Sequence, residues 1–466
     1  MSDTPRRTLL KRIGIAGLTT AALGTGAAAG RGPNHNTPNT PDQANARVRG
    51  RTDLLGHELP EGEKPRYTFG TTSPDGMWGG VSSFPSSHFS TGSDSNVVAT
   101  LYDLSDLENP TVAHELEWPV ENHRSNHMRF DGTRDGLYYV THEMDEGAEE
   151  PLGMSVVDFG WGEGTPEEPE VLATLETPNT GSHTNAEHPE DTVVYMIDKA
   201  DSEPGVIPVD VSEPGDPEQT GPFGPDGFCH ALEVDPIREI LHCAYIGGDF
   251  VGYVILDISE DPLHPEEIGR FDYDDHPDYT EVGEPGFEDC HQAHFDPNRD
   301  IAIVGDELFG ELPGGKHVFD IGWGEGSLED PQPISHFYSP DAREQDVGVW
   351  TTHFHDILQD GDETLLVDGG YSQGFWVANI TDPENPVATE RFATDLELDR
   401  ADTRHSPGTA PYNWSAVWND EREFAFSSDT LTGAYTFSVD ARPARGEDGG
   451  GPDSHYDLEA ILERYS

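Results

Sequence analysis

The sequence predicts an all-β protein, folded as a single β-propeller of seven four-stranded blades. The 51 Gly and 37 Pro among 466 residues are too many for a helical protein and indicate many turns. A short apolar run that ends in Asp recurs along the chain, with intervals from 47 residues (Asp210 to Asp257) to 63 residues (Asp257 to Asp320). Four strand-like runs per repeat, at a period near ~50 residues, are typical of propeller blades.

The repeat can be followed through seven anchor positions. They are Asp103, Asp158, Asp210, Asp257, Asp320, Asn379 and Ser438. The copies at Asp158 and Asp320 share an insertion, Gly-Trp-Gly-Glu-Gly, at 160–164 and 322–326. One copy illustrates the blade: the runs 230–234, 240–245, 253–257 and 267–271 are apolar and separated by turn residues.

The last repeat lacks a fourth strand, because residues 442–453 are rich in Pro, Gly and acidic residues. The segment 64–70 resembles fourth-strand segments such as 385–392. We therefore expect an N-terminal strand near Tyr67 to complete the last blade, which would close the ring and remove a free sheet edge. The expected propeller spans 63–441, after a disordered linker at 31–62 and before an acidic C-terminal tail at 442–466.

The repeat unit has the pattern Asp, an apolar residue, Ser, Asp or Glu, and then Pro. This pattern resembles the LVIVD repeat, a propeller repeat of exported bacterial and archaeal proteins. The best copies lie at 101–119, 206–220, 254–273 and 375–392. The resemblance covers about residues 65–440 and implies the fold, but it says little about activity.

Residues 1–30 resemble a twin-arginine export signal. Arg6 and Arg7 precede a Gly- and Ala-rich run, 13–29, that is too weakly apolar for a stable membrane helix. No second apolar run is long enough to span a membrane. The sequence thus predicts a secreted, extracellular and monomeric protein without an integral membrane segment.

The charge of the chain excludes several partners. Lys+Arg is 26 and Asp+Glu is 90, which gives 26 − 90 = −64, so affinity for nucleic acid or an anionic membrane is not expected. Acidic residues spread along the whole chain are similar to a haloarchaeal composition, suited to high salt. The alternative is a calcium-loaded acidic protein, but no Asp-rich calcium loop is present. Three cysteines do not make a disulfide scaffold.

Histidine carries the functional signal, since no nucleophile elbow, P-loop, zincin motif or dinucleotide fingerprint occurs. When the innermost strands are aligned on the last residue before the next turn, which is apolar in five of them and Glu187 in the sixth, one position four residues earlier recurs. It holds, in order, Asn126, His183, His230, His291, His353 and Asn413. Because the first strand of every blade lines the central channel, these side chains are expected to form a ring around the axis.

Four converging imidazoles predict a transition-metal site for Cu, Fe, Mn or Zn, with His183, His230, His291 and His353 as ligands. The residues expected to support the ligands from a second layer are Glu233, His294, His355, Asp356, Asn126 and Asn413. Cys229 and Cys290 should point away from the axis, because side chains alternate along a strand. In the alternative interpretation each histidine only bonds the backbone of the next blade.

Two functions follow from these alternatives. The first is a metal-dependent oxidoreductase or hydrolase acting on a small molecule, with catalytic residues unassigned. It is similar, in arrangement only, to the carotenoid-cleavage oxygenases and to the selenium-binding protein and methanethiol oxidase family. The second is an extracellular propeller that binds a protein or glycan through loops such as 143–152, 274–287 and 339–348, with structural histidines.

Overall fold

The computed structural model describes residues 52–62, 65–84, 95–118, 123–144, 153–179, 181–199, 201–276, 286–309, 313–340, 342, 349–401 and 411–439. The expected export signal, the acidic tail and most of the three loops named above lie outside these ranges. In the part of the chain that is described, no helix is long and apolar enough to cross a membrane.

Antiparallel strands make up six sheets. The first sheet contains β2 (Arg66–Thr72), β3 (Trp78–Phe84), β4 (Val97–Asp103) and β5 (Thr111–Glu117). The second contains β6 (His123–Arg124), β7 (Met128–Phe130), β8 (Leu137–Met144), β9 (Gly153–Asp158) and β10 (Glu170–Glu176). The third contains β11 (Ser182–Glu187), β12 (Val193–Asp198), β13 (Pro204–Asp210), β14 (Glu218–Gln219) and β15 (Phe223–Asp226).

The remaining sheets follow in chain order. The fourth contains β16 (Phe228–Asp235), β17 (Ile240–Gly247), β18 (Gly252–Asp257) and β19 (Glu266–Asp272). The fifth contains β20 (Cys290–Phe295), β21 (Ile301–Asp306), β22 (Lys316–Asp320) and β23 (Gln332–Phe337). The eight-stranded sixth contains β24 (Phe354–Asp360), β25 (Glu363–Gly369), β26 (Phe375–Asn379), β27 (Val387–Phe392), β28 (Asn413–Asn419), β29 (Phe424–Asp429), β30 (Gly433–Val439) and β1 (Thr52–Glu58).

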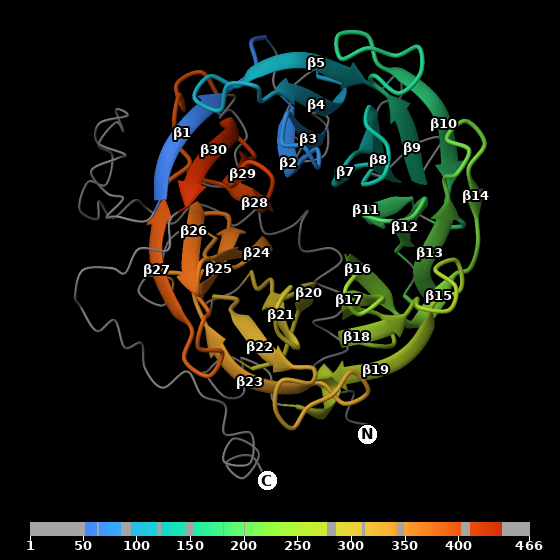
Figure 1. Cartoon of the computed structure of the whole chain (residues 1–466), viewed down its shortest axis with the longest axis vertical. Helices are drawn as coiled ribbons and strands as arrows, with labels where there is room; N and C mark the ends of the chain where they lie inside the picture. Colours follow the sequence, from blue (N-terminus) through green and yellow to red (C-terminus); the bar gives the residue numbers. More distant parts are fainter. Residues whose placement is uncertain are drawn as a thin grey trace, which may run out of the picture.

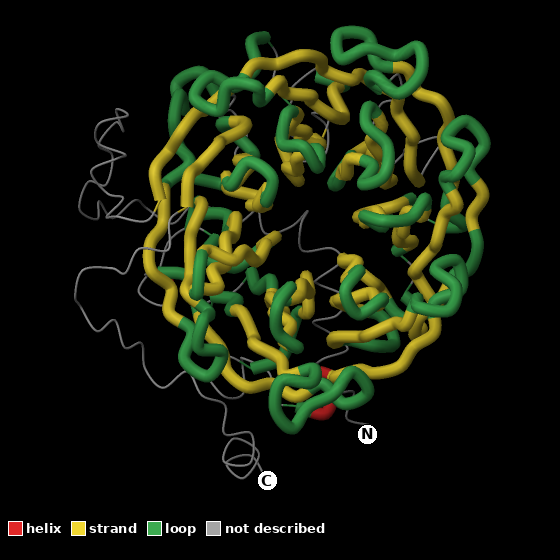
Figure 2. The backbone as a smooth tube through the Cα atoms, viewed as in Figure 1, coloured by secondary structure: helices red, strands yellow, loops and turns green. Residues whose placement is uncertain are grey.

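The sheets surround one axis, with β2, β7, β11, β16, β20, β24 and β28 nearest to it (Figure 1). Strands and turns account for nearly the whole ring, and the helical element η2 (Tyr273–Asp275) is a single 3-10 turn (Figure 2). The all-β, propeller-like architecture predicted from the repeat is confirmed at this level.

The eight-stranded sheet consists of two antiparallel runs. The run β24–β27 and the run β28–β30 meet through one parallel pairing, Phe354 with Ser415. Strand β1 then pairs with β30, from Thr52 opposite Val439 to Glu58 opposite Ala434. An N-terminal strand therefore does lie beside β30, the last strand of the described part of the chain.

The identity of that strand corrects two expectations. Tyr67 lies in β2, which pairs with β3 in the first sheet and not with β30. The pairing strand is Thr52–Glu58, within the segment expected to be a disordered linker. Its sequence, Thr-Asp-Leu-Leu-Gly-His-Glu, has little apolar alternation, and its order comes from the backbone ladder to β30 and from His57, whose Nε2 lies 2.7 Å from the carbonyl oxygen of Thr432.

The hydrophobic core lies between neighbouring sheets. One cluster joins Val206 and Ile197 of the third sheet to Leu241 and Val254 of the fourth. Another joins Ala244 and Tyr253 to Val304 and Phe319. Side chains on both faces of each sheet are thus buried, which explains why these strands read as nearly continuous apolar runs.

The repeated Gly-Trp-Gly-Glu-Gly insertion is a turn wound around the Asp anchor. The Asp158 carboxylate accepts backbone N–H bonds from Gly160, Trp161, Gly162 and Gly164. A Cβ at Gly164 would lie 2.2 Å from the carbonyl oxygen of Asp158, so only glycine fits there. Asp320 holds the second copy in the same way.

Candidate metal centre

The four predicted histidines form one row of neighbouring rings. Centroid distances are 4.4 Å from His183 to His230, 4.0 Å from His230 to His291, and 4.4 Å from His291 to His353. All four side chains are buried. The strands β11, β16, β20 and β24 bring them together from four successive positions around the ring.

Local backbone irregularities aim these side chains. The register of β16 with β17 shifts between Cys229 and Ala231, and that of β20 with β21 shifts between Cys290 and Gln292. His230 and His291 are therefore the extra residues of two β-bulges, a device that redirects a side chain. Cys229 and Cys290 are buried in apolar clusters between sheets, as expected from alternation.

Backbone carbonyls fix the tautomer of two of these rings. The Nδ1 atom of His230 lies 3.1 Å from the carbonyl oxygen of His291, and that of His353 lies 2.5 Å from the carbonyl oxygen of Trp414. A carbonyl oxygen only accepts, so each Nδ1 carries the proton and each Nε2 keeps its lone pair. This arrangement orients an imidazole for metal ligation.

Glu307 completes a group that could hold a metal ion. One ligand atom each from His291, Glu307 and His353 lie within 4.8 Å of one another, and all three residues are buried. The Nε2 atoms of His291 and His353 are 3.5 Å and 3.4 Å from the two Glu307 carboxylate oxygens. The Tyr371 hydroxyl donates to Glu307 and anchors its carboxylate. Within the described ranges this is the one group of its kind.

His291 is unusual because neither ring nitrogen has a hydrogen-bond partner, although the side chain is only 1 % exposed. Burying a polar group without a partner is costly. Burial also holds the pKa of His291 and His353 well below the usual value, and it lowers the pKa of His230 to about 3. The rings are therefore neutral at pH 7, the form that binds metal. Burial raises the pKa of Glu307 to about 7.

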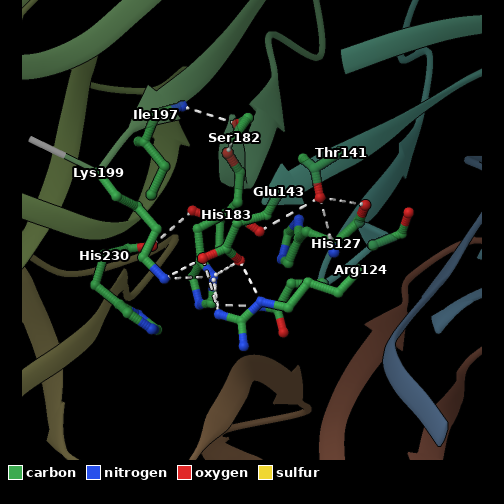
Figure 3. Close-up of polar contacts among 12 residues, drawn as sticks. Arg124, His127, Thr141, Glu143, Ser182, His183, Ile197, Lys199 and His230 are labelled. Atoms are coloured by element: carbon green, nitrogen blue, oxygen red, sulfur yellow. Dashed lines mark hydrogen bonds and ion pairs between the residues drawn. The ribbon is translucent and has the colours of Figure 1, made fainter. Parts of the chain in front are cut away.

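The other end of the row has a different environment, shown in Figure 3. His183 donates from Nδ1 to Glu143 at 2.6 Å, and its Nε2 accepts from the Asn126 amide at 3.1 Å. Arg124 holds both Glu143 oxygens, at 2.6 Å and 2.9 Å, and Lys199 also donates to Glu143. Burial opposes ionisation of Glu143, but the Arg124 charge keeps its pKa well below the usual range. Both nitrogens of His183 are thus already engaged.

The predicted ring of six is corrected at Asn413. Its amide donates to Thr394 and Ser427, away from the histidines. The register of β28 with β29 shifts between Asn413 and Ser415, so Trp414 takes the bulge position that histidine takes in β16 and β20. Trp414 packs on His353 with a centroid distance of 4.6 Å. Counting back from the last apolar residue misplaced this strand by one residue.

The predicted supporting residues lie elsewhere. Glu233 pairs with Arg129 at 2.6 Å, and His294 pairs with Asp356 at 3.3 Å. Glu233, His294 and Asp356 each lie three residues after the histidine of the row in their own segment. His355 Nδ1 lies 2.7 Å from the Lys316 ammonium, between two sheets. Of the six supporting residues proposed from the sequence, only Asn126 contacts a ring nitrogen of the row.

Sequence reasoning missed Glu307, Glu143, Lys199 and Tyr371. Glu307 and Lys199 directly follow the second strands β21 and β12, Glu143 lies one residue before the end of β8, and Tyr371 lies two residues after β25. The repeat could have pointed to these positions, because the end of the second strand pairs with the start of the first strand, beside the histidine. These positions hold Glu, Lys or Tyr, however, and no single residue type recurs.

Comparisons with known proteins add only the fold. No family model and no curated protein matches the chain. A similar solved structure is that of a functionally unknown protein from Desulfotomaculum acetoxidans DSM 771, at 13% identity and a TM-score of 0.50, covering 73% of this chain and 90% of that chain. A likeness at this identity supports the β architecture and carries no function to this chain.

Proposed function

We propose that this protein is a metal-dependent oxidoreductase that acts on a small molecule, with its metal held by His291, His353 and Glu307. The observation that carries the proposal is the buried His291 ring, whose two nitrogens lack partners while its Nε2 faces Glu307. Two histidines and one carboxylate with open coordination positions are the donor set of non-haem Fe(II) oxygenases. Manganese accepts the same donors.

The surrounding residues would hold the ligands in place. The Trp414 carbonyl orients His353, and Tyr371 orients the Glu307 carboxylate. His230 lies beside this group, with its centroid 4.0 Å from that of His291, and its Nδ1 bond to the His291 carbonyl leaves the lone pair on Nε2. Three protein ligands leave coordination positions for substrate, as catalytic sites require.

Metal analysis of the whole chain, folded in high salt and reconstituted with Fe, Mn, Cu or Zn, tests the proposal. We expect about one metal per chain, lost in His291→Ala, His353→Ala and Glu307→Gln. The matched control is His264→Ala, since His264 is exposed, pairs with Asp261 and lies outside the histidine row. Equal metal content in Glu307→Gln and the parent protein would refute the site.

A second function, a binding or scaffold propeller without catalysis, is favoured by one observation. His230 donates to a carbonyl of the next sheet, and His353 donates to a carbonyl of β28, in the second run of the eight-stranded sheet, as structural histidines would. Such a role leaves the unpartnered nitrogens of His291 unexplained. A protein that binds no metal yet unfolds more easily after His230→Ala would favour the scaffold.

We further propose that the ring is a closed seven-bladed propeller, in which the eight-stranded sheet counts as two blades and β1 completes the last. The pairing of β1 with β30 supports this count. The paired arginines near the N-terminus and the net charge of −64 support export into a saline environment. Membership of the LVIVD repeat class rests on the Asp-anchored repeat unit.

A further inference from the structure

A recurring arginine fastens neighbouring sheets at the end of the ring opposite the histidine row. Arg134, Arg299 and Arg422 each lie in the turn between the first and second strands of a sheet, three residues after an Asp or Asn. Asp131 and Asp296 hold their arginines by ion pairs, and Asn419 accepts the backbone N–H of Arg422. The guanidinium then reaches the next sheet.

The carbonyls that accept these guanidinium groups occupy one position of the repeat. Arg134 donates to Val211 at 2.6 Å, Arg299 to Ile380 and Thr381 at 3.0 Å and 2.7 Å, and Arg422 to Leu104 at 2.5 Å. These residues directly follow the third strands β13, β26 and β4. A guanidinium acceptor site thus recurs at three junctions. Arg238, three residues after Asp235, departs from it and donates to the carbonyls of Asp296 and Arg299.

The junction between the first and second sheets has the acceptor position but no arginine. The corresponding turn of the first sheet, between β2 and β3, has Ser73 in place of the Asp and Gly76 in place of the Arg. Gly76 has φ 66°, and a Cβ there would lie 2.5 Å from Asn419 Oδ1, so a side chain at this position would be strained and would displace Asn419. Phe159 and Gly160, directly after β9, take the acceptor position.

A cavity of about 230 Å³ lies at this junction, and Phe159 and Gly160 line it. Its lining includes the partly buried Trp78 and the buried Phe130 and Phe159, and an aromatic face suits a cation. Arg134 also lines the cavity, but its guanidinium is already held by Asp131 and by the Val211 carbonyl. Asp75 and Asp135 also line it and are exposed. The hydrogen bonds found for Asp75, from Ser73 and Met77, go to Oδ1, which leaves Oδ2 for a ligand.

We propose that this cavity binds a small guanidinium compound, which takes the place of the missing arginine side chain. Its N–H groups would donate to the Phe159 and Gly160 carbonyls, as arginines do at three other junctions, while Asp75 supplies the charge-assisted bond. The planar cation would lie against the partly buried Trp78. The site is separate from the histidine row and does not depend on the proposed metal.

Calorimetric titration of the full chain at one fixed high salt concentration tests the site. The probe is N-methylguanidinium, and N-methylurea, of the same shape but uncharged, is its matched control. We expect saturable binding of the cation alone. Absence of binding at millimolar concentration, or equal binding of N-methylurea, would overturn the proposal.

Two variants locate the binding. Asp75→Asn keeps the Oδ1 acceptor but removes the charge, and we expect about tenfold weaker binding, a loss near 1.4 kcal/mol. Gly160→Phe fills the cavity without a close backbone contact, because its Cβ would meet only Gly136 at 3.7 Å, and it should abolish binding. Gly215→Phe, at an exposed glycine with nothing within 4 Å, is the control for added apolar surface. Binding that survives Gly160→Phe would place the ligand elsewhere and refute the site.

Discussion

His230 donates its Nδ1 proton to the backbone carbonyl of His291, 3.1 Å away on the next sheet. This one bond joins two members of the histidine row and fixes the tautomer of the first. The ring nitrogens of the second, His291, make no hydrogen bond, and its Nε2 lies 3.5 Å from Glu307. His353 makes the equivalent bond to Trp414. The row therefore combines histidines that hold sheets together with one that only a ligand would satisfy.

The first prediction separates these two roles in metal-free protein. His230→Leu removes a buried hydrogen bond and leaves the His291 carbonyl unpaired, so it should lower the free energy of unfolding by about 1–3 kcal/mol. His291→Leu removes two unsatisfied polar atoms and should be neutral or stabilising. Chemical denaturation at constant salt measures both. A larger loss for His291→Leu than for His230→Leu would contradict the assignment.

The second prediction concerns acid. Burial lowers the pKa of ten described histidines, most strongly those of His127, His183, His230, His291, His353 and His355. Below pH ~6.5 these histidines are protonated in the unfolded chain but not in the folded chain. Each histidine therefore lowers the free energy of unfolding by up to about 1.4 kcal/mol per pH unit. Glu187 and Glu307, with pKa values raised to about 7 by burial, act in the opposite direction between pH ~4.5 and 7.

Burial also raises the pKa of Asp289, Asp356 and Asp429, which act in the same direction as the two glutamates. The histidines with a lowered pKa outnumber these five carboxyls, so the thermal midpoint should fall as pH is lowered from 7.5 to 5 at fixed salt and without metal. His291→Leu should make the fall less steep, while the exposed His264→Ala should leave it unchanged. A midpoint that rises on acidification would show that the row is not buried in its neutral form.

The third prediction tests closure of the ring. Removing residues 1–62 deletes β1 and exposes the β30 edge, which should lower the thermal midpoint and promote association. Removing only residues 1–51 keeps β1 and is the control. Sedimentation analysis measures association. If the shorter chain stays monomeric with an unchanged midpoint, β1 does not close the ring.

The fourth prediction follows from the charge. With a net charge of −64, the folded chain depends on screening, and the Debye length falls from about 10 Å at 0.1 M salt to about 3 Å at 1 M. Circular dichroism should show a much lower thermal midpoint near 0.1 M KCl than near 3 M. An equal midpoint in both would contradict a halophilic protein.

The fold could be predicted because the repeat imposes its pattern on every sheet. An apolar third strand that ends in Asp recurs, and so does the histidine of the first strand, at His183, His230, His291 and His353. The N-terminal strand could not be predicted, because Thr52–Glu58 has weak apolar alternation and is ordered by pairing with a strand almost 400 positions away in the chain.

The site was predicted only where the repeat itself carries it. Asn413 was misplaced by one residue, because a β-bulge changes the count along the strand without a mark in the sequence. Glu307 was missed because its carboxylate meets His291 and His353 only through the fold, and nearby acidic residues are abundant. The prediction of the supporting residues was wrong because a side chain three positions further along a strand lies at another level of the ring.

Anomalous X-ray diffraction from crystals of the protein reconstituted with Fe(II) or Mn(II) tests the central claim most directly. We predict one metal peak about 2.0–2.2 Å from His291 Nε2, His353 Nε2 and a Glu307 oxygen, the usual range for such bonds. The same peak should be absent in Glu307→Gln. No peak at these residues after reconstitution with Fe, Mn, Cu and Zn, or a peak held by other side chains, would contradict the account.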